Sequence, residues 1–185
     1  MSIADIAKSV IKSINDGDTL ATVTLPASNF HEGTVKLATV LLGKKLGGIY
    51  ITTSRPSSHI VTELEEAKAN LSDLYFVDLV SMTVGGNTDD ARTLFIESPT
   101  MLESILLNIS LLERRLKAKR IFVIFDSING LSIYSKPMVL KEFINVLGNS
   151  MRIKSIYTML MTVEEQTDDD LAAALELLSD TMIGT

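Results

Sequence analysis

The sequence has no cysteine and no tryptophan, and proline and glycine are scarce. The absence of cysteine excludes disulfides, thiolate metal sites and cysteine nucleophiles together, and the cytoplasm is the simplest compartment for such a chain. With 4 prolines and 10 glycines among 185 residues, we expect neither a long linker nor a disordered tail. The chain also shows no internal repeat.

The sequence has fewer basic than acidic residues. Lysine and arginine total 17 against 23 acidic residues, which gives a net charge of −6. Nucleic-acid binding needs a basic face, so we expect no nucleic-acid partner. The one basic cluster, at 114–120, follows a predicted helix, where cations complement the helix dipole.

Long apolar runs are missing as well. None reaches the roughly 18 residues that a membrane helix needs, so we expect no membrane partner. The opening stretch "MSIADIAKSVIKSINDGD" has apolar residues at helical spacing and a polar face, which is unlike a signal peptide.

What is present is a large apolar content, 46% of the residues, which is enough for one sizeable core. We therefore expect a single domain over 1–185, with an N-terminal helix at 1–17 and a core at 18–185. Apolar runs predict strands at 19–25, 48–53, 74–80, 120–126 and 155–161, with a short one at the end of the chain. Helical patterns lie between them near 33–46, 57–70, 99–116, 136–149 and 169–178.

The strand segments are rich in Ile, Val and Phe and lack polar alternation, which is typical of central parallel strands. Alternation of such strands with helices predicts an α/β fold, a doubly wound, mainly parallel sheet with helices on both faces. In the third helical segment, Ser98 is the predicted N-cap and Pro99 lies in the first turn.

Ligands of such sheets bind beyond the carboxyl ends of the strands. The segments to inspect are therefore 26–33, 54–56, 126–130 and the residues from 162 onwards. The first of them joins the strand "TLATVTL" to a helix, which is the layout of a phosphate-binding loop.

Read in order, these elements resemble the RecA superfamily, most closely the KaiC-like and RadA-like ATPase domains. "RIFVIFDSINGLSIY" is similar to the Walker B strand and ends its apolar run at Asp126. "GGIYITTSRPS" resembles the neighbouring strand, and "LLSDTMIGT" resembles the last one. The resemblance extends from about residue 18 to residue 184, implies a RecA-like P-loop NTPase fold, and favours an archaeal source.

The resemblance also implies a degenerate Walker A motif. Matching G-x-x-x-x-G-K-[ST] to the following helix places Ser28 at the first glycine and Gly33 at the second. Thr34 then stands at the lysine position and Val35 at the magnesium-binding hydroxyl. Without the lysine no ammonium reaches the phosphates, and a valine side chain cannot coordinate Mg²⁺.

A second change is independent of the first. Ser54 and Arg55 stand where the KaiC-like ATPases have the glutamates that activate water, so a general base is missing there. We interpret the chain as a pseudo-ATPase with no catalytic residue, no metal site and no cofactor. The alternative is a nucleotide sensor or an ATPase with a non-standard phosphate loop, holding ATP through backbone amides, Arg55 and Asp126.

Two of these side chains have competing interpretations. Arg55 either binds phosphate or forms a salt bridge to Asp126 or Glu32. Asp126, without a metal, is expected to accept hydrogen bonds from Thr34, Ser127 or nearby backbone. His31 has no partner at catalytic spacing and is expected to be an ordinary loop residue, and a second histidine, at position 59 in the first turn of a predicted helix, carries even less signal.

Two further segments bear on the partner. In "TVEEQTDDDLAAALELL", Asp168 to Asp170 are expected to cap a helix, with calcium binding as a weaker alternative, and their charge opposes a DNA-binding loop. The loop at 81–100 is long enough to contact a partner. The expected function is regulatory or signalling protein interaction, through another protein or self-association.

Overall fold

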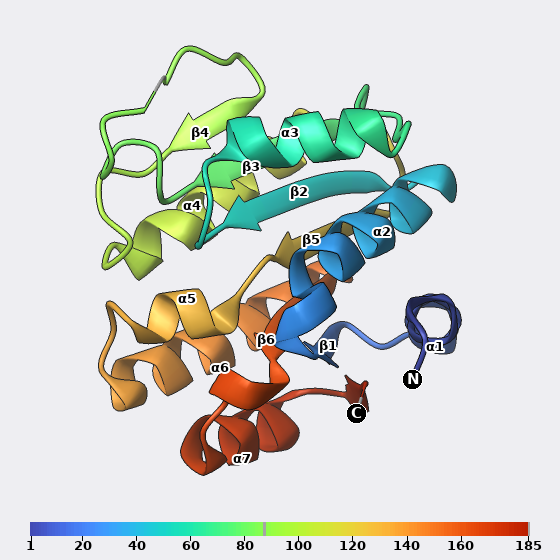
Figure 1. Ribbon diagram of the computed structural model, residues 1–185, viewed down its shortest axis with the longest axis vertical. Coiled ribbons are helices and arrows are strands. Elements are labelled where there is room, and N and C mark those ends of the chain that lie inside the picture. Colours follow the sequence, from blue (N-terminus) through green and yellow to red (C-terminus); the bar gives the residue numbers. More distant parts are fainter. Residues whose placement is uncertain (87, 185) are drawn as a thin grey trace.

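The computed structural model describes residues 1–86 and 88–184, and its strands form one seven-stranded sheet. Figure 1 shows this sheet with helices packed around it. The strand order is β4-β3-β2-β5-β6-β1-β7, and all paired strands are parallel. The strands are β1 (Leu20–Leu25), β2 (Gly47–Thr52), β3 (Leu74–Asp78), β4 (Thr93–Phe95), β5 (Ile121–Phe125), β6 (Tyr157–Val163) and β7 (Thr181–Ile183). The predicted fold class is confirmed.

Helices cover both faces of this sheet. They are α1 (Ile3–Asp16), α2 (Phe30–Gly43), α3 (Ser57–Glu66), α4 (Leu102–Glu113), α5 (Ile128–Ser132), α6 (Pro137–Lys154) and α7 (Asp169–Leu178), with 3₁₀ turns η1 (Ala27–Asn29) and η2 (Glu164–Gln166). Helices α1, α2 and α3 pack on one face and α4 to α7 on the other, so the strands contribute side chains to two separate cores. This burial on both faces explains the unbroken apolar strands.

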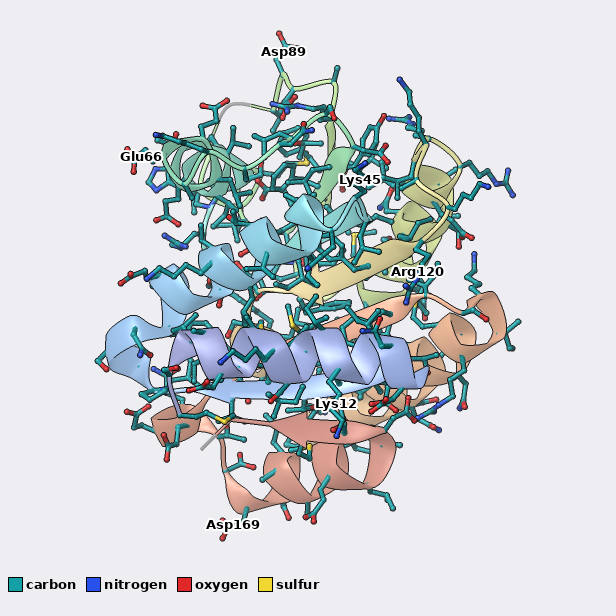
Figure 2. All side chains as sticks on the ribbon, turned by 90° about the vertical axis from the view of Figure 1, so that its right-hand side faces the viewer. Lys12, Lys45, Glu66, Asp89, Arg120 and Asp169 are labelled. Carbon is teal, nitrogen blue, oxygen red and sulfur yellow. The ribbon has the colours of Figure 1, made fainter. Side chains whose placement is uncertain are left out.

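The surface carries scattered charge. Lys12 on α1, Lys45 after α2 and Arg120 before β5 point outward from separate elements (Figure 2). Within residues 1–86 and 88–184, no helix combines the length and apolar character needed to span a bilayer.

Helix ends follow the capping rules at several points. The Asp168 carboxylate accepts from the Leu171 amide at 2.7 Å and caps α7, with Asp169 and Asp170 in the first turn. The capping role predicted for this acidic segment is confirmed. At the end of α1, Gly17 adopts φ of 91°, a left-handed conformation that favours glycine.

The predicted start of the third helical segment is wrong. Helix α4 begins at Leu102, three residues after Pro99. The Ser98 hydroxyl accepts from the Thr100 amide at 3.3 Å, and the Met101 amide donates to the Ser98 carbonyl. A local turn therefore uses the Ser98 side chain before the helix starts.

Two short elements were not predicted. Strand β4 has three residues and adds an edge to β3, and α5 has five residues after β5. Both are shorter than the windows from which periodicity can be recognised. Of the predicted long loop at 81–100, Asn87 lies outside the described residues, as does Thr185 of the predicted core.

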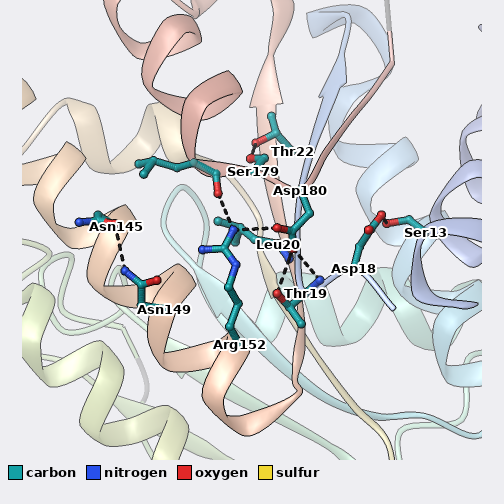
Figure 3. A network of polar contacts seen from close by, with 11 residues as sticks. Ser13, Asp18, Thr19, Leu20, Thr22, Asn145, Asn149, Arg152, Ser179 and Asp180 are labelled. Carbon is teal, nitrogen blue, oxygen red and sulfur yellow. Dashed lines mark hydrogen bonds and ion pairs between the residues drawn. The ribbon is translucent and has the colours of Figure 1, made fainter. Parts of the chain in front are cut away.

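Strand β1 comes early in the chain but pairs with the last two strands, between β6 and the edge strand β7. Leu20 is paired with Thr158 of β6, and Ala21 is paired with Thr181 of β7. Asp180, just before β7, binds the start of β1. Its carboxylate accepts from the Thr19 and Leu20 amides at 2.8 and 2.9 Å (Figure 3).

Arg152 on α6 completes this network. Its guanidinium donates to Asp180 Oδ1 at 2.8 Å and to the Leu178 carbonyl at 2.9 Å (Figure 3). Partial burial works against ionisation of Asp180, but Arg152 and the amides of Thr19 and Leu20 lower its pKa to about 2.

We expect Asp180→Asn to lower the free energy of unfolding by about 1–2 kcal/mol at pH 7, a value reduced for solvent screening. Because the folded pKa is depressed, this stabilisation is present above pH ~4 and is lost as the pH falls toward 2. Urea denaturation at pH 7 and pH 2 measures it, with the exposed Glu97→Gln as control. An equal difference at both pH values would contradict the assignment.

Candidate functional site

The predicted site residues lie on segments that follow β1, β2 and β5. In a parallel sheet these segments meet at one edge, and the arrowheads of β2 and β4 mark it on the left of Figure 1. Strand β6 lies between β1 and β5, so the segment carrying Ser28 and the one carrying Asp126 leave the sheet from strands that are not neighbours.

The segment after β1 is a compact helical turn. Residues Ala27 to Asn29 form η1, and α2 begins at Phe30, whose side chain is only 3% exposed. The Asn29 amide donates to the Pro26 carbonyl, and the Phe30 amide donates to the Ala27 carbonyl. These two amides are therefore committed to the turn itself.

A carboxylate of the same chain occupies the first amide of this turn. Glu165, in η2 after β6, accepts from the Ala27 amide at 2.8 Å through Oε2. An amide that could contact an anionic ligand therefore already contacts an internal anion. The predicted position Ser28, next to it, is exposed.

Gly33, the one retained glycine of the motif, is explained by close packing. It is buried in the first turn of α2, and a Cβ added there would lie 2.7 Å from Leu25 of β1 and 2.8 Å from Ile3 of α1. Its φ is not positive. The glycine lets α2 lie against both elements.

Thr34 and Val35 are buried within the same helix. Thr34 is 1% exposed, and its hydroxyl donates to the Phe30 carbonyl at 2.8 Å, one turn earlier. Val35 is 5% exposed and belongs to the core below α2. The predicted hydrogen bond from Thr34 to Asp126 is not formed.

Arg55 pairs with a residue that sequence reasoning did not consider. Its guanidinium donates to both carboxylate oxygens of Glu63, on α3, at 2.5 and 2.9 Å. The predicted salt bridge to Asp126 or Glu32 is wrong, because Glu63 faces Arg55 across two turns of α3 while Glu32 pairs with Lys36. Such a two-pronged pair fixes the guanidinium firmly.

The Arg55–Glu63 pair lies beside His31. Partial desolvation of the imidazole ring, with a smaller contribution from the positive charge of Arg55, lowers the pKa of His31 below its ordinary value. His31 is therefore neutral at physiological pH.

Asp126 is enclosed at the end of β5, with 3% exposure. Its carboxyl group accepts from the Thr53 amide at 2.8 Å, the Thr53 hydroxyl at 2.8 Å and the Ser54 hydroxyl at 3.3 Å. The expected contact with neighbouring backbone is confirmed. The predicted bond from Ser127 to this carboxyl group is not formed, and the Ser127 hydroxyl instead accepts from the Gly130 amide and caps α5.

The surroundings of Asp126 also determine its pKa. Burial raises its pKa to about 6, although the hydrogen bonds from Thr53 act in the opposite direction. The Thr53 hydroxyl also lies 2.6 Å from the Ser127 carbonyl, yet it has only one proton to donate. The Thr53 hydroxyl is therefore shared between two acceptors, Asp126 Oδ1 and the Ser127 carbonyl oxygen.

Helix α5, absent from the sequence prediction, closes the edge beside Asp126. A Cβ at Gly130 would lie 2.6 Å from the Thr53 hydroxyl, so only glycine fits against the end of β2. Asn129, 5% exposed, accepts from the Val163 amide at 2.9 Å and donates to the Gln166 carbonyl at 3.0 Å. These bonds tie α5 to the segment that carries Glu165.

Asp78 is a second buried carboxylate that sequence reasoning missed. It ends β3, is fully buried, and accepts from the amides of Ser57, Val80 and Ser81 at 2.7 to 2.8 Å. Burial alone would raise its pKa, but these hydrogen bonds outweigh it and lower the pKa. The signal was an aspartate ending the apolar run "LYFVD".

A cavity of about 480 Å³ lies between the β1–α2 turn and α3. Ala27 to Glu32, Val35 and Lys36 line one side, and Glu63, Glu66 and Ala67 of α3 line the other. Asn29 Oδ1 is buried and, within the described part of the chain, has no hydrogen-bond partner. Glu66 stands at the rim and points outward (Figure 2).

The remaining predictions concern histidines and metals. His31 is exposed but lies in the first turn of α2 rather than in a loop, and His59 is exposed in the first turn of α3, where it was predicted. Among residues 1–86 and 88–184 no group of three or more His, Asp or Glu side chains is arranged to hold a metal ion.

Comparison with known proteins gives the fold but no sequence relative. No family model matches the chain, and no curated protein matches it. Among solved structures, it is similar to a KaiC-like protein from the hyperthermophilic archaeon Pyrococcus horikoshii OT3, with a TM-score of 0.64 and 11% sequence identity. The match covers 90% of this chain and 69% of that chain, and it supports a KaiC/RecA-like fold.

Proposed function

We propose that this chain is a RecA/KaiC-like domain without ATPase activity, which acts by binding protein. In this proposal the segment 28–35 is a degenerate Walker A motif whose positions have become structural. Gly33 packs against its neighbours, Thr34 donates within its own helix, and Val35 belongs to the core. A cytoplasmic, regulatory or signalling role in an archaeon is part of the same proposal and rests on the resemblance.

The contact between Glu165 and the Ala27 amide carries the proposal. A phosphate at this turn would have to displace the carboxylate, and the displaced carboxylate would remain close enough to repel it. The second support is Arg55, the nearest candidate to replace the missing lysine, because both of its terminal nitrogens are engaged by Glu63. Both groups therefore already have an anionic partner within the chain, which opposes a role in stabilising charge during phosphoryl transfer.

We expect Mg²⁺ and ATP to leave the melting temperature unchanged and to give no hydrolysis above background. A ligand at a hundredfold excess over its dissociation constant would stabilise the fold by about 2.7 kcal/mol, which a thermal melt detects easily. Differential scanning calorimetry with ATP, ADP and no nucleotide makes the measurement, and phosphate release is followed in parallel. Turnover that disappears in Asp126→Asn would defeat the proposal.

The alternative function, a nucleotide or small-molecule sensor, has one observation in its favour. The cavity beside α3 is of ligand size. Its walls carry Glu32, Glu63 and Glu66, which disfavour a polyanion. Stabilisation by ATP in the same melts would move this alternative ahead of the first proposal.

A further inference from the structure

Apolar side chains are exposed along two adjacent helices, α4 and α6. Leu107 and Leu111 of α4 are 62% and 43% exposed, and Val139 and Val146 of α6 are 47% and 44% exposed. We call these residues, together with Glu103 and Arg114 of α4, the α4–α6 face. Clustered exposed apolar side chains mark interaction sites more often than singly scattered ones do.

The two helices run in the same direction. At one end, Glu103 of α4 and Glu142 of α6 line the same shallow groove. At the other end, Glu113 of α4 pairs with Lys154 of α6. The outer stripe of α4 places Glu103, Leu107, Leu111 and Arg114 at intervals of three or four residues, so they project to one side.

Charge is divided between the ends of this face. Glu103 and Glu142 are exposed at its amino end, and Arg114 and Arg115 are exposed at its carboxyl end. Within residues 1–86 and 88–184, none of these four takes part in an ion pair. The α4 dipole accounts for charges placed this way, but it does not account for two exposed leucines between them.

Such a face is complementary to itself. A two-fold axis across the middle of α4, near Ile109, would place a second α4 antiparallel to the first. Glu103 of each copy would then lie opposite Arg114 and Arg115 of the other, and Leu107 would lie opposite Leu111. In this arrangement the apolar centre of one face meets the apolar centre of the other, and the acidic end of each face meets the basic end of its partner.

We propose that the α4–α6 face binds the same face of a second copy of this chain and forms a two-fold symmetric dimer. This inference rests on the proposed function, protein interaction, and it names the partner. The face lies on the side of the sheet opposite α1, α2 and α3 and does not involve the β1–α2 turn.

The dimensions of the face set the expected strength. Helix α4, with 12 residues, is about 18 Å long and α6, with 18 residues, about 27 Å long. Two such helices side by side offer an interface at the small end of the range for specific complexes. We therefore expect a reversible dimer with a dissociation constant in the micromolar range.

Sedimentation equilibrium of the full chain, from about 1 to 300 µM, tests the proposal. Leu107→Glu should raise the dissociation constant at least about tenfold, because it puts an unpaired charge at the centre of the interface. Leu177→Glu is the matched control, since Leu177 on α7 is also an exposed leucine, at 83% against 62% for Leu107. It should leave the dimer unchanged.

Charge exchange tests the symmetry. Glu103→Arg alone should weaken the dimer, and adding Arg114→Glu to it should restore association, because acid and base again face each other. Circular dichroism melts confirm that each variant folds. A protein that stays monomeric throughout, or a dimer that only Leu177→Glu weakens, would overturn the proposal, and neither result bears on the nucleotide melts.

Discussion

Asp78→Ala will lower the free energy of unfolding by about 3–5 kcal/mol. The carboxylate at the end of β3 accepts from three backbone amides, of Ser57, Val80 and Ser81, and from the Ser81 hydroxyl at 2.7 Å. Alanine would leave these donors buried without acceptors, since Asp78 is fully enclosed. The Ser57 amide lies in the first turn of α3, so the loss also loosens that helix from the sheet.

Guanidinium denaturation of Asp78→Ala, followed by circular dichroism, measures this effect. Asp73→Ala is the matched control: Asp73 also accepts from two amides, of Lys117 and Ala118, but at a half-exposed position where water can replace it. We expect a cost of about 1 kcal/mol there. Equal losses of unfolding free energy in the two variants would show that the burial of Asp78 and its hydrogen bonds is unimportant for stability.

Asp126→Asn will raise the free energy of unfolding by about 1–3 kcal/mol at pH 8. The pKa of Asp126 is about 6 in the folded chain, above the ordinary value of 3.8. A raised acid pKa means that the folded chain holds the proton more tightly, so this contribution is full below pH ~4 and is lost as the pH rises through 6. An asparagine side chain does not ionise, so the Asp126→Asn variant does not lose this stability as the pH rises.

Urea denaturation of the parent and of Asp126→Asn at several pH values between 4 and 8 tests this prediction. The difference between them should grow with pH, while Glu66→Gln, which removes a solvent-facing carboxylate, should show no such trend. A destabilised variant at pH 8 would mean that the fold requires the carboxylate anion, as a metal-binding role would.

The fold was predictable because its signal is distributed along the chain. Long apolar strands alternate with helices whose periodicity extends over several turns, and the carboxyl edge follows from parallel pairing. Asp126 at the end of β5 and the capping role of Asp168 were likewise accessible, because each depends on residues next to it in sequence.

The contacts that define the edge were not predictable. Glu63 meets Arg55, Glu165 meets Ala27, and Gly130 fits against Thr53, and each pairing is set by how one helix is placed on the sheet. No sequence spacing distinguishes Glu63 from Glu32 as the partner of Arg55. Helix α5 was missed because its order comes from the Asn129 bonds to the segment after β6 rather than from periodicity.

The position of β1 in the sheet has a consequence for synthesis of the chain. Its neighbours are β6 and β7, and Leu20 meets Thr158. At 5–20 residues per second, about 140 residues separate these partners by roughly 7 to 30 seconds of translation. Strands β2, β3 and β4 can pair with one another during that interval, whereas β1 stays an unpaired apolar segment on the ribosome. A trigger for misfolding during translation is therefore concentrated in the first 25 residues, where a chaperone binding site would be most useful.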